Sequence, residues 1–163
     1  MIKIGQGLDV HTFCEGDFVT LGGVKIPHNK GLLAHSDGDV VLHALCDALL
    51  GALALGDIGQ HFPDNDPKFK GADSKVLLDQ VYTLIKHQGY VLGNADITIV
   101  CERPKIAPYN DKMCQCIADV LKTPKQNISI KATTSEKMGF TGQECRPQGS
   151  QVNPRAFKLT YRS

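Results

Sequence analysis

Three residues in the first third of the chain have the types and spacing of a zinc site. Asp9 and His11 stand two positions apart, and His43 follows within the polar and apolar run 35–47. Catalytic zinc is often held by three ligands of this kind, with the fourth position open to substrate. If residues 1–10 form a strand, Asp9 and His11 point to one face and can share an ion. Taken alone, the pair is more typical of a capped turn, and His43 of a hydrogen-bonded core histidine.

A helix is expected to begin near positions 37 and 38 and to carry His43. Ser36 and Asp37 are suitable caps for this helix, and apolar residues recur at helical spacing at positions 41, 42, 45, 48, 49 and 52. Asp39, His43 and Asp47 follow one another at intervals of four, so they share one face. A polar stripe on so apolar a helix must face solvent, a metal site or a subunit boundary.

The remaining segments alternate between strands and helices, which predicts a two-layer α/β domain. We expect an α+β sandwich with one mixed β-sheet and helices on one of its faces. The expected elements are a hairpin at 19–26 with a glycine–glycine turn, a loop at 56–67, a helix from a Ser74 cap to about Gln88, strands at 95–101 and 128–133, a helix within 104–121, and a last strand within 156–161. In the helix that Ser74 caps, the residues expected to face inward are Val76, Leu77, Leu78, Val81, Leu84 and Ile85.

The composition is that of one globular domain covering residues 1–163. The chain is 42% hydrophobic and 21% charged, and its formal net charge is +1, so neither nucleic acid nor a membrane surface is an expected partner. Its first residues have the pattern of a strand, and we therefore expect no targeting segment. Six scattered cysteines without a C-x-x-C pair are typical of reduced thiols in the cytoplasm.

Ten short motifs, taken in order, carry a family resemblance. They are residues 7–13, 35–39, 42–44, 47–52, 56–59, 61–67, 70–74, 104–105, 131–136 and 139–142. Together they resemble the 2-C-methyl-D-erythritol 2,4-cyclodiphosphate synthase family. Because several long motifs coincide in the right order, an accidental match is not a sufficient explanation.

The resemblance implies a reaction and an assembly. In this family the 2-phosphate of 4-diphosphocytidyl-2-C-methyl-D-erythritol 2-phosphate attacks the β-phosphorus of the same molecule, which closes a ring and expels CMP. The step belongs to the non-mevalonate (MEP) route to isoprenoids. Members are homotrimers of α/β subunits, and each active site lies at a boundary between subunits. The resemblance therefore implies a cyclising phosphorus–oxygen lyase.

The resemblance also assigns roles to residues by motif position. The implied metal ligands are Asp9, His11 and His43 for zinc, and Glu136 for magnesium or manganese. The implied transition-state stabilisers are His35 and Thr134. The implied substrate-binding residues are Asp9, His11, His35, Ser36, Asp57, Ile58, Gly59, Phe62, Pro63, Asp64, Asn65, Asp66, Cys101, Pro104, Lys105, Ala107, Thr133, Thr134, Ser135, Glu136, Phe140 and Gln143.

The resemblance stops abruptly after Gly142. The family continues with an arginine, whereas this chain has Gln143, which offers a phosphate no charge, and residues 143–163 differ from the family through divergence or a sequence error. The family's trimer axis encloses a cavity for an isoprenoid diphosphate, and this change leaves open whether that cavity carries over. Two other functions stay open: a metal-dependent cytidine-nucleotide phosphohydrolase, and an inactive trimeric module that binds metal or isoprenoid diphosphate.

Overall fold

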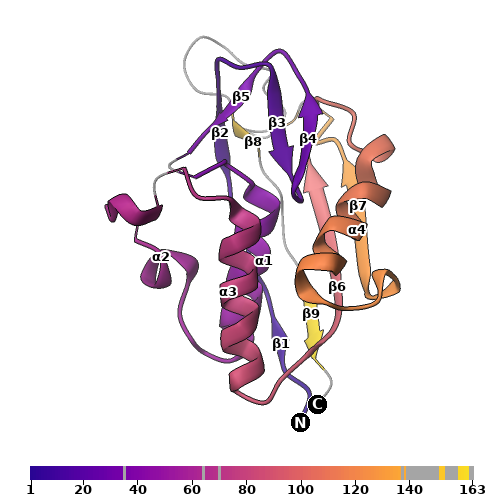
Figure 1. Ribbon diagram of the computed structural model, residues 1–163. Coiled ribbons are helices and arrows are strands. Elements are labelled where there is room, and N and C mark those ends of the chain that lie inside the picture. Colours follow the sequence, from indigo (N-terminus) through magenta and orange to yellow (C-terminus); the bar gives the residue numbers. More distant parts are fainter. Residues whose placement is uncertain are drawn as a thin grey trace.

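The computed structural model describes residues 1–34, 36–63, 65–69, 71–136 and 138, and the backbone of 151–152 and 158–161 (Figure 1). The strands are β1 (Ile4–Gly5), β2 (His11–Cys14), β3 (Phe18–Leu21), β4 (Val24–Pro27), β5 (Gly31–Leu33), β6 (Leu92–Val100), β7 (Ile128–Thr133), β8 (Gln151–Val152) and β9 (Lys158–Tyr161). The α-helices are α1 (Val40–Ala52), α2 (Ile58–His61), α3 (Ser74–His87) and α4 (Asn110–Leu121), and short 3-10 helices cover Pro67–Phe69, Ala107–Tyr109 and Lys125–Asn127.

The strands form three sheets, and the mixed α/β architecture predicted from the sequence is confirmed. The largest sheet has the order β1-β9-β6-β7, in which β6 and β7 run parallel and the other pairs antiparallel. Helices α1, α3 and α4 lie on one face of this sheet (Figure 1). The smaller sheets, β5-β2-β8 and the hairpin β3-β4, gather at the upper end in Figure 1. The expectation of one sheet was therefore incomplete.

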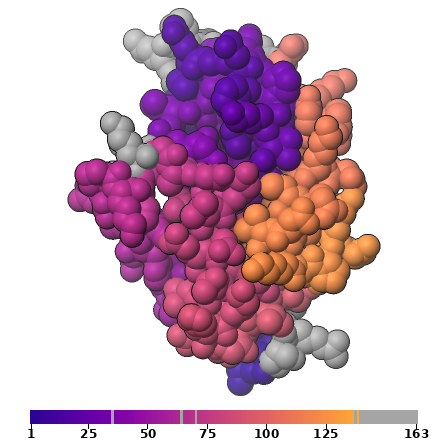
Figure 2. All heavy atoms as spheres, in the orientation of Figure 1, coloured from indigo at the N-terminus to yellow at the C-terminus, as the bar shows by residue number. Residues whose placement is uncertain are grey.

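Helix α1 is the centre of the hydrophobic core. Ten of its 13 residues are buried, so it is enclosed by the sheet and the neighbouring helices instead of facing solvent along one side. Figure 2 shows α3 and α4 side by side on the outer surface, where both present polar side chains to solvent. Among the described residues, no helix has the length and apolarity needed to cross a bilayer.

The amino-terminal segment is not the continuous strand expected over residues 1–10. Strand β1 covers only Ile4–Gly5, β2 begins at His11, and Asp9 lies in the connection between them. The segment is held instead by close packing against α1. A Cβ atom placed on Gly5 would lie 1.8 Å from the carbonyl oxygen of Ala48, so only glycine permits this approach.

Helix α1 begins two to three residues later than expected, because Asp39 is its cap. The Asp39 carboxylate accepts hydrogen bonds from the backbone N–H groups of Val41 (3.2 Å) and Leu42 (3.1 Å). The same fully buried carboxylate accepts from the N–H groups of Gly22 (2.8 Å) and Gly23 (2.5 Å), in the predicted glycine–glycine turn of the β3–β4 hairpin. Asp39 thus joins the hairpin to α1, which Ser36 and Asp37 do not do.

Three further expectations about helices need correction. The cap of α3 is Asp73, whose side chain accepts from the N–H of Lys75, and Ser74 is the first helical residue. Val76, expected to face inward, is 52% exposed, because α3 packs on α1 and α4 through another side. The segment 56–67 is not all loop: it contains α2, which Asp57 caps by accepting from the N–H of Gln60.

Candidate functional site

The structure brings Asp9, His11 and His43 together. Asp9 Oδ2 lies 3.1 Å from His43 Nδ1 and 3.5 Å from His11 Nδ1, and the two imidazole rings are 5.3 Å apart. One potential ligand atom from each residue lies within 4.8 Å of the other two. His11 Nε2 is buried and has no hydrogen-bond partner among the described residues. An unpartnered buried nitrogen beside a carboxylate and a second imidazole is the donor set expected of a metal site.

Each of the three residues comes from a different part of the fold. Asp9 lies in the β1–β2 connection, His11 opens β2, and His43 is the fourth residue of α1. The close packing of residues 5–7 on α1 brings Asp9 to the helix, and the cap at Asp39 fixes where the first turn begins. The site therefore depends on the junction between this connection and the start of α1.

Asp9 and His43 form a mutually stabilised charged pair. Burial alone would raise the pKa of Asp9, but the hydrogen bond with His43 and the charges of His11 and His43 outweigh burial, so this pKa lies below its ordinary value. Burial alone would lower the pKa of His43, but the hydrogen bond and charge of Asp9 raise it above its ordinary value. A cation bound here would replace the proton that this pair shares.

The opposite nitrogen of His43 is also held by the protein. His43 Nε2 lies 2.9 Å from the hydroxyl of Ser74 and 3.2 Å from that of Ser36, and the Ser74 hydroxyl donates to Asp37 Oδ1 (2.5 Å). Sequence reasoning gave Ser74 and Asp37 only helix-capping roles. The motif 70–74 was the available signal for Ser74, but its contact with His43 depends on tertiary packing.

The triad lies in a cavity of about 300 Å³. Its lining residues are Asp9, His11, Leu33, Ala34, Ser36, His43, Asp47, Ile58, Gly59, Phe62, Phe69 and Leu77. The rings of Phe62 and Phe69 meet edge to face at 5.3 Å along this wall. Seven of the residues predicted to bind substrate or metal, His43 included, therefore line one cavity.

Asp47 belongs to this cavity and was predicted only as part of a polar stripe. Its Oδ1 accepts a hydrogen bond from the backbone N–H of Ile58 (2.7 Å), which ties α1 to the start of α2. Burial raises its pKa above the ordinary value, more than the hydrogen bond from Ile58 lowers it, and the nearby charges of Asp57 and Asp9 raise it further. Of the three residues of the stripe, Asp39 thus contacts the hairpin turn, His43 belongs to the metal triad, and Asp47 contacts the start of α2.

The other predicted residues of the 57–66 segment lie outside the cavity lining. The carboxylate of Asp57 is occupied locally, since it accepts from both the backbone N–H (3.0 Å) and the side-chain amide of Gln60 (2.7 Å). Pro63 and Asn65 are exposed, and Asp66 accepts from the backbone N–H of Lys68 (2.9 Å). Asp57, Pro63 and Asn65 are thus exposed and Asp66 partly exposed, and ligand binding by these residues stays a prediction.

A second cluster joins the ends of the parallel strands β6 and β7. The backbone N–H of Cys101 donates to the carbonyl of Thr133 (3.0 Å), and the carboxylate of Glu102 accepts from both the N–H and the hydroxyl of Ser135, each at 2.8 Å. Beyond them, the hydroxyl of Thr134 donates to Glu136 (2.5 Å), which is exposed. Glu102 was not predicted; it couples the 101–107 and 133–136 segments.

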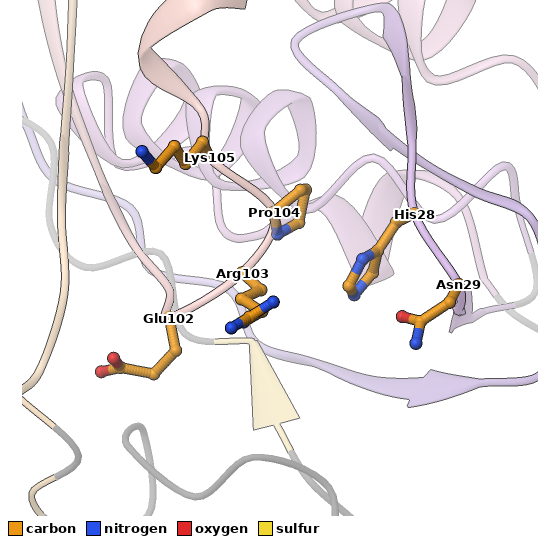
Figure 3. A pocket seen from close by; sticks show the side chains of 6 residues that line it. All are labelled: His28, Asn29, Glu102, Arg103, Pro104 and Lys105. Carbon is orange, nitrogen blue, oxygen red and sulfur yellow. The ribbon is translucent and has the colours of Figure 1, made fainter.

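This cluster borders its own cavity, of about 570 Å³, lined by His28, Asn29, Glu102, Arg103, Pro104 and Lys105 (Figure 3). In Figure 3 His28 and Asn29 lie across the hollow from the 102–105 segment, in which the Arg103–Pro104 peptide bond is cis. Ala107 begins the following 3-10 helix. Burial, and then the charge of Glu102, raises the pKa of the Cys101 thiol to about 12, so this thiol is not a nucleophile at neutral pH.

The two clusters line separate cavities and share no lining residue. Thr134 and Glu136 are thus not placed beside Asp9, His11 and His43 within one described cavity of this chain. Four predicted site residues, His35, Asp64, Phe140 and Gln143, lie outside the described residues.

Comparison with known proteins identifies similar chains. A 2-C-methyl-D-erythritol 2,4-cyclodiphosphate synthase of Acinetobacter baumannii is 73% identical over 143 residues, which are 88% of this chain and 89% of that protein. Among solved structures, a 2C-methyl-D-erythritol-2,4-cyclodiphosphate synthase in a CDP-bound form has a TM-score of 0.84 and 37% identity, covering 97% of this chain and 99% of the other. The bifunctional IspDF from Campylobacter jejuni has a TM-score of 0.88 and 43% identity, covering 99% of this chain but only 42% of its own length.

The profile of the YgbB family matches residues 2–150. This range includes the metal triad, both cavities and the motifs on which the resemblance was based. With a relative of this identity over most of both lengths, the resemblance is confirmed, and the chain belongs to the YgbB family, together with the 2-C-methyl-D-erythritol 2,4-cyclodiphosphate synthases.

Proposed function

We propose that the protein converts 4-diphosphocytidyl-2-C-methyl-D-erythritol 2-phosphate to 2-C-methyl-D-erythritol 2,4-cyclodiphosphate and CMP. One observation carries this proposal: Asp9, His11 and His43 converge in a cavity of a chain that is 73% identical to a synthase of that name. The 2-phosphate oxygen forms a bond to the β-phosphorus, and the bond from that phosphorus to the oxygen of the α-phosphate breaks. CMP leaves with that oxygen and its electron pair.

The residues present fit the two metals that the family uses. Asp9, His11 and His43 offer the nitrogen and oxygen ligands of a three-ligand zinc site, and the unpartnered His11 Nε2 supports this assignment. Glu136 offers the carboxylate oxygens that magnesium or manganese prefers. When bound, these ions supply positive charge that draws two anionic phosphates together.

The protein's own contribution is binding and orientation. The attacking phosphate already carries charge, so no general base is needed. In this proposal Thr134 and His35 donate hydrogen bonds to the phosphoryl oxygens that gain charge in the transition state. In this proposal the methylerythritol part of the substrate is held by four residues that line the triad's cavity: Ser36, Ile58, Gly59 and Phe62.

The nucleotide half of the substrate is assigned to the second cluster. Lys105 supplies a positive charge for the phosphate of the CMP part, and residues 101–107 and 133–136 surround the nucleotide. Because the two clusters line separate cavities in one chain, the proposal places each active site between two subunits of a homotrimer. The five described cysteines are free thiols, which supports a reducing, cytoplasmic setting.

A turnover assay with metal analysis on the same sample tests the proposal. Followed by phosphorus NMR, the reaction should yield the cyclic diphosphate and CMP in equal amounts. CMP with a linear product would instead identify a phosphohydrolase, and binding without turnover an inactive module. His43→Ala should lose bound zinc and activity, whereas His87→Ala, at an exposed position near the end of α3, should keep both. Stoichiometric zinc in His43→Ala would overturn the ligand assignment.

A further inference from the structure

The side of the His43 ring that faces away from Asp9 contacts a buried hydroxyl. His43 Nε2 lies 2.9 Å from Ser74 Oγ, and Ser74 is fully buried. The Ser74 hydroxyl in turn donates to Asp37 Oδ1 at 2.5 Å. Asp37, Ser74 and His43 therefore form a continuous chain of hydrogen bonds that ends at the metal triad.

The direction of each hydrogen bond follows from the number of protons available. A serine hydroxyl has one proton, and a carboxylate can only accept, so the Ser74 proton points to Asp37. Ser74 Oγ must then accept from His43, which places a proton on Nε2. The Ser36 hydroxyl, 3.2 Å from the same nitrogen, accepts from the N–H of Gly38 and is the longer contact. With Nε2 protonated, Nδ1 is the nitrogen left for a cation beside Asp9.

Asp37 is itself fixed at several points. Its Oδ2 accepts from the backbone N–H of Ser74 (3.3 Å), and its Oδ1 accepts from the N–H of Asp39 (3.3 Å). Its own N–H donates to the carbonyl of Ala72 (3.2 Å). These contacts join the entry of α1 to the entry of α3. The carboxylate is held in place before any ligand arrives.

We propose that Ser74 and Asp37 are positioning residues for the metal site: they fix the orientation and the tautomer of His43 so that Nδ1 faces the ion. The proposal rests on the metal site of the proposed function. When a group that hydrogen-bonds the non-ligating ring nitrogen of a metal-bound histidine is removed, metal affinity commonly falls about 10–100-fold. The Ser74 hydroxyl is not needed to start α3, because Asp73 is the cap.

Zinc affinity of the metal-free protein, measured by competition with a chromophoric chelator, tests this role. We expect Ser74→Ala to weaken zinc binding by about 10–100-fold. Asp37→Asn keeps an acceptor for the hydroxyl but removes its charge, and it should weaken binding by a smaller factor. In the zinc-loaded protein, proton–nitrogen NMR should show a bonded proton on His43 Nε2, and in Ser74→Ala this signal should broaden or disappear through exchange with water.

A variant of the neighbouring residue distinguishes an effect on the orientation of His43 from an effect on folding stability. Asp73→Ala removes the α3 cap next to Ser74 without touching the hydrogen bonds to His43. It should lower stability and leave zinc affinity within about twofold, whereas Ser74→Ala should weaken zinc binding by the larger factor given above because it removes the hydroxyl that contacts His43.

Equal zinc affinity in Ser74→Ala and the unsubstituted protein would overturn the proposal, as would equal weakening in Ser74→Ala and Asp73→Ala. Failure of the proposed function looks different. If only the cyclisation is absent, zinc binding and the effect of Ser74→Ala on it remain; if the metal site itself is wrong, the unsubstituted protein binds no zinc at His43 and the positioning role falls with that site.

Discussion

Gly7 crosses helix α1 so closely that a Cβ atom on it would lie 1.9 Å from the carbonyl oxygen of Ala44. Ala44 follows His43 directly, and Asp9 lies two residues beyond Gly7, so this crossing sets the spacing of two metal-site residues. Gly7→Ala must push backbone away from backbone, because no side-chain rotation relieves the contact. We expect it to cost about 3 kcal/mol of folding free energy in urea titration and to weaken zinc binding.

The matched control is Gly51→Ala, on the same helix. There the nearest atom to a new Cβ, outside the helix backbone, is the carbonyl oxygen of Gln6 at 3.8 Å, an ordinary contact. Alanine also favours a helix over glycine by roughly 0.5–1 kcal/mol, so this variant should be neutral or more stable. Unchanged stability and zinc binding in Gly7→Ala would show that the segment can move away from α1 without affecting the site.

Local spacing made Asp9, His11 and His43 candidates for a metal site, but taken alone it was more typical of a capped turn and a core histidine, and the family motifs were needed to select these residues. The two-residue spacing of Asp9 and His11 and the apolar periodicity around His43 both survive in the structure, although Asp9 lies just before the strand and not inside it. The start of α1 could not be predicted in the same way. Asp39 is the cap because its carboxylate also accepts hydrogen bonds from the N–H groups of Gly22 and Gly23. That contact exists only once the hairpin packs on the helix.

The burial of a residue on a helix could not be predicted from the local sequence pattern either. Periodicity identifies an apolar residue such as Val76 but not which neighbours will cover it, and here the packing of α3 leaves it exposed. Ser74 is the converse case. A small polar residue at the start of a helix is typical of a cap, and only the packing of α3 against α1 brings its hydroxyl to His43.

The raised pKa of Asp47 predicts a pH-dependent effect on stability. Because the pKa in the folded protein lies above the value of about 4 in the unfolded chain, the folded state binds the proton more tightly. The resulting stabilisation is fully present below about pH 4 and is lost as pH rises through the folded-state pKa. Asp47→Asn, which stays neutral and can still accept from Ile58, should therefore gain stability relative to the unsubstituted protein as pH rises through this window.

Urea titrations at several pH values from 4 to 7 measure this difference. Asp79→Asn, at an exposed position on α3, controls for the loss of one negative charge. If the stability of Asp47→Asn runs parallel to that of the unsubstituted protein across the range, or falls relative to it, the burial of Asp47 does not govern its protonation.

Separate cavities for the metal triad and for Lys105 lead to a prediction about mixed oligomers. If each active site takes the triad from one subunit and the nucleotide segment from its neighbour, His43→Ala and Lys105→Ala chains should complement each other. Each variant alone should have low activity. In co-expressed trimers of random composition, about a quarter of the sites combine two intact halves, so about a quarter of the original activity should return.

A second mixture distinguishes active sites shared between subunits from active sites complete within one chain. The unsubstituted chain mixed one to one with a His43→Ala/Lys105→Ala chain should also keep about a quarter of its activity if sites are shared, but about half if each chain holds a complete site. The two chains should carry different affinity tags, so that purification in sequence shows that mixed trimers have formed, and activity should be assayed on the unfractionated mixture, to which these fractions apply. No recovery in the first mixture together with half activity in the second would place the whole active site within one chain, and the metal triad and Lys105 would then have to approach each other within that chain.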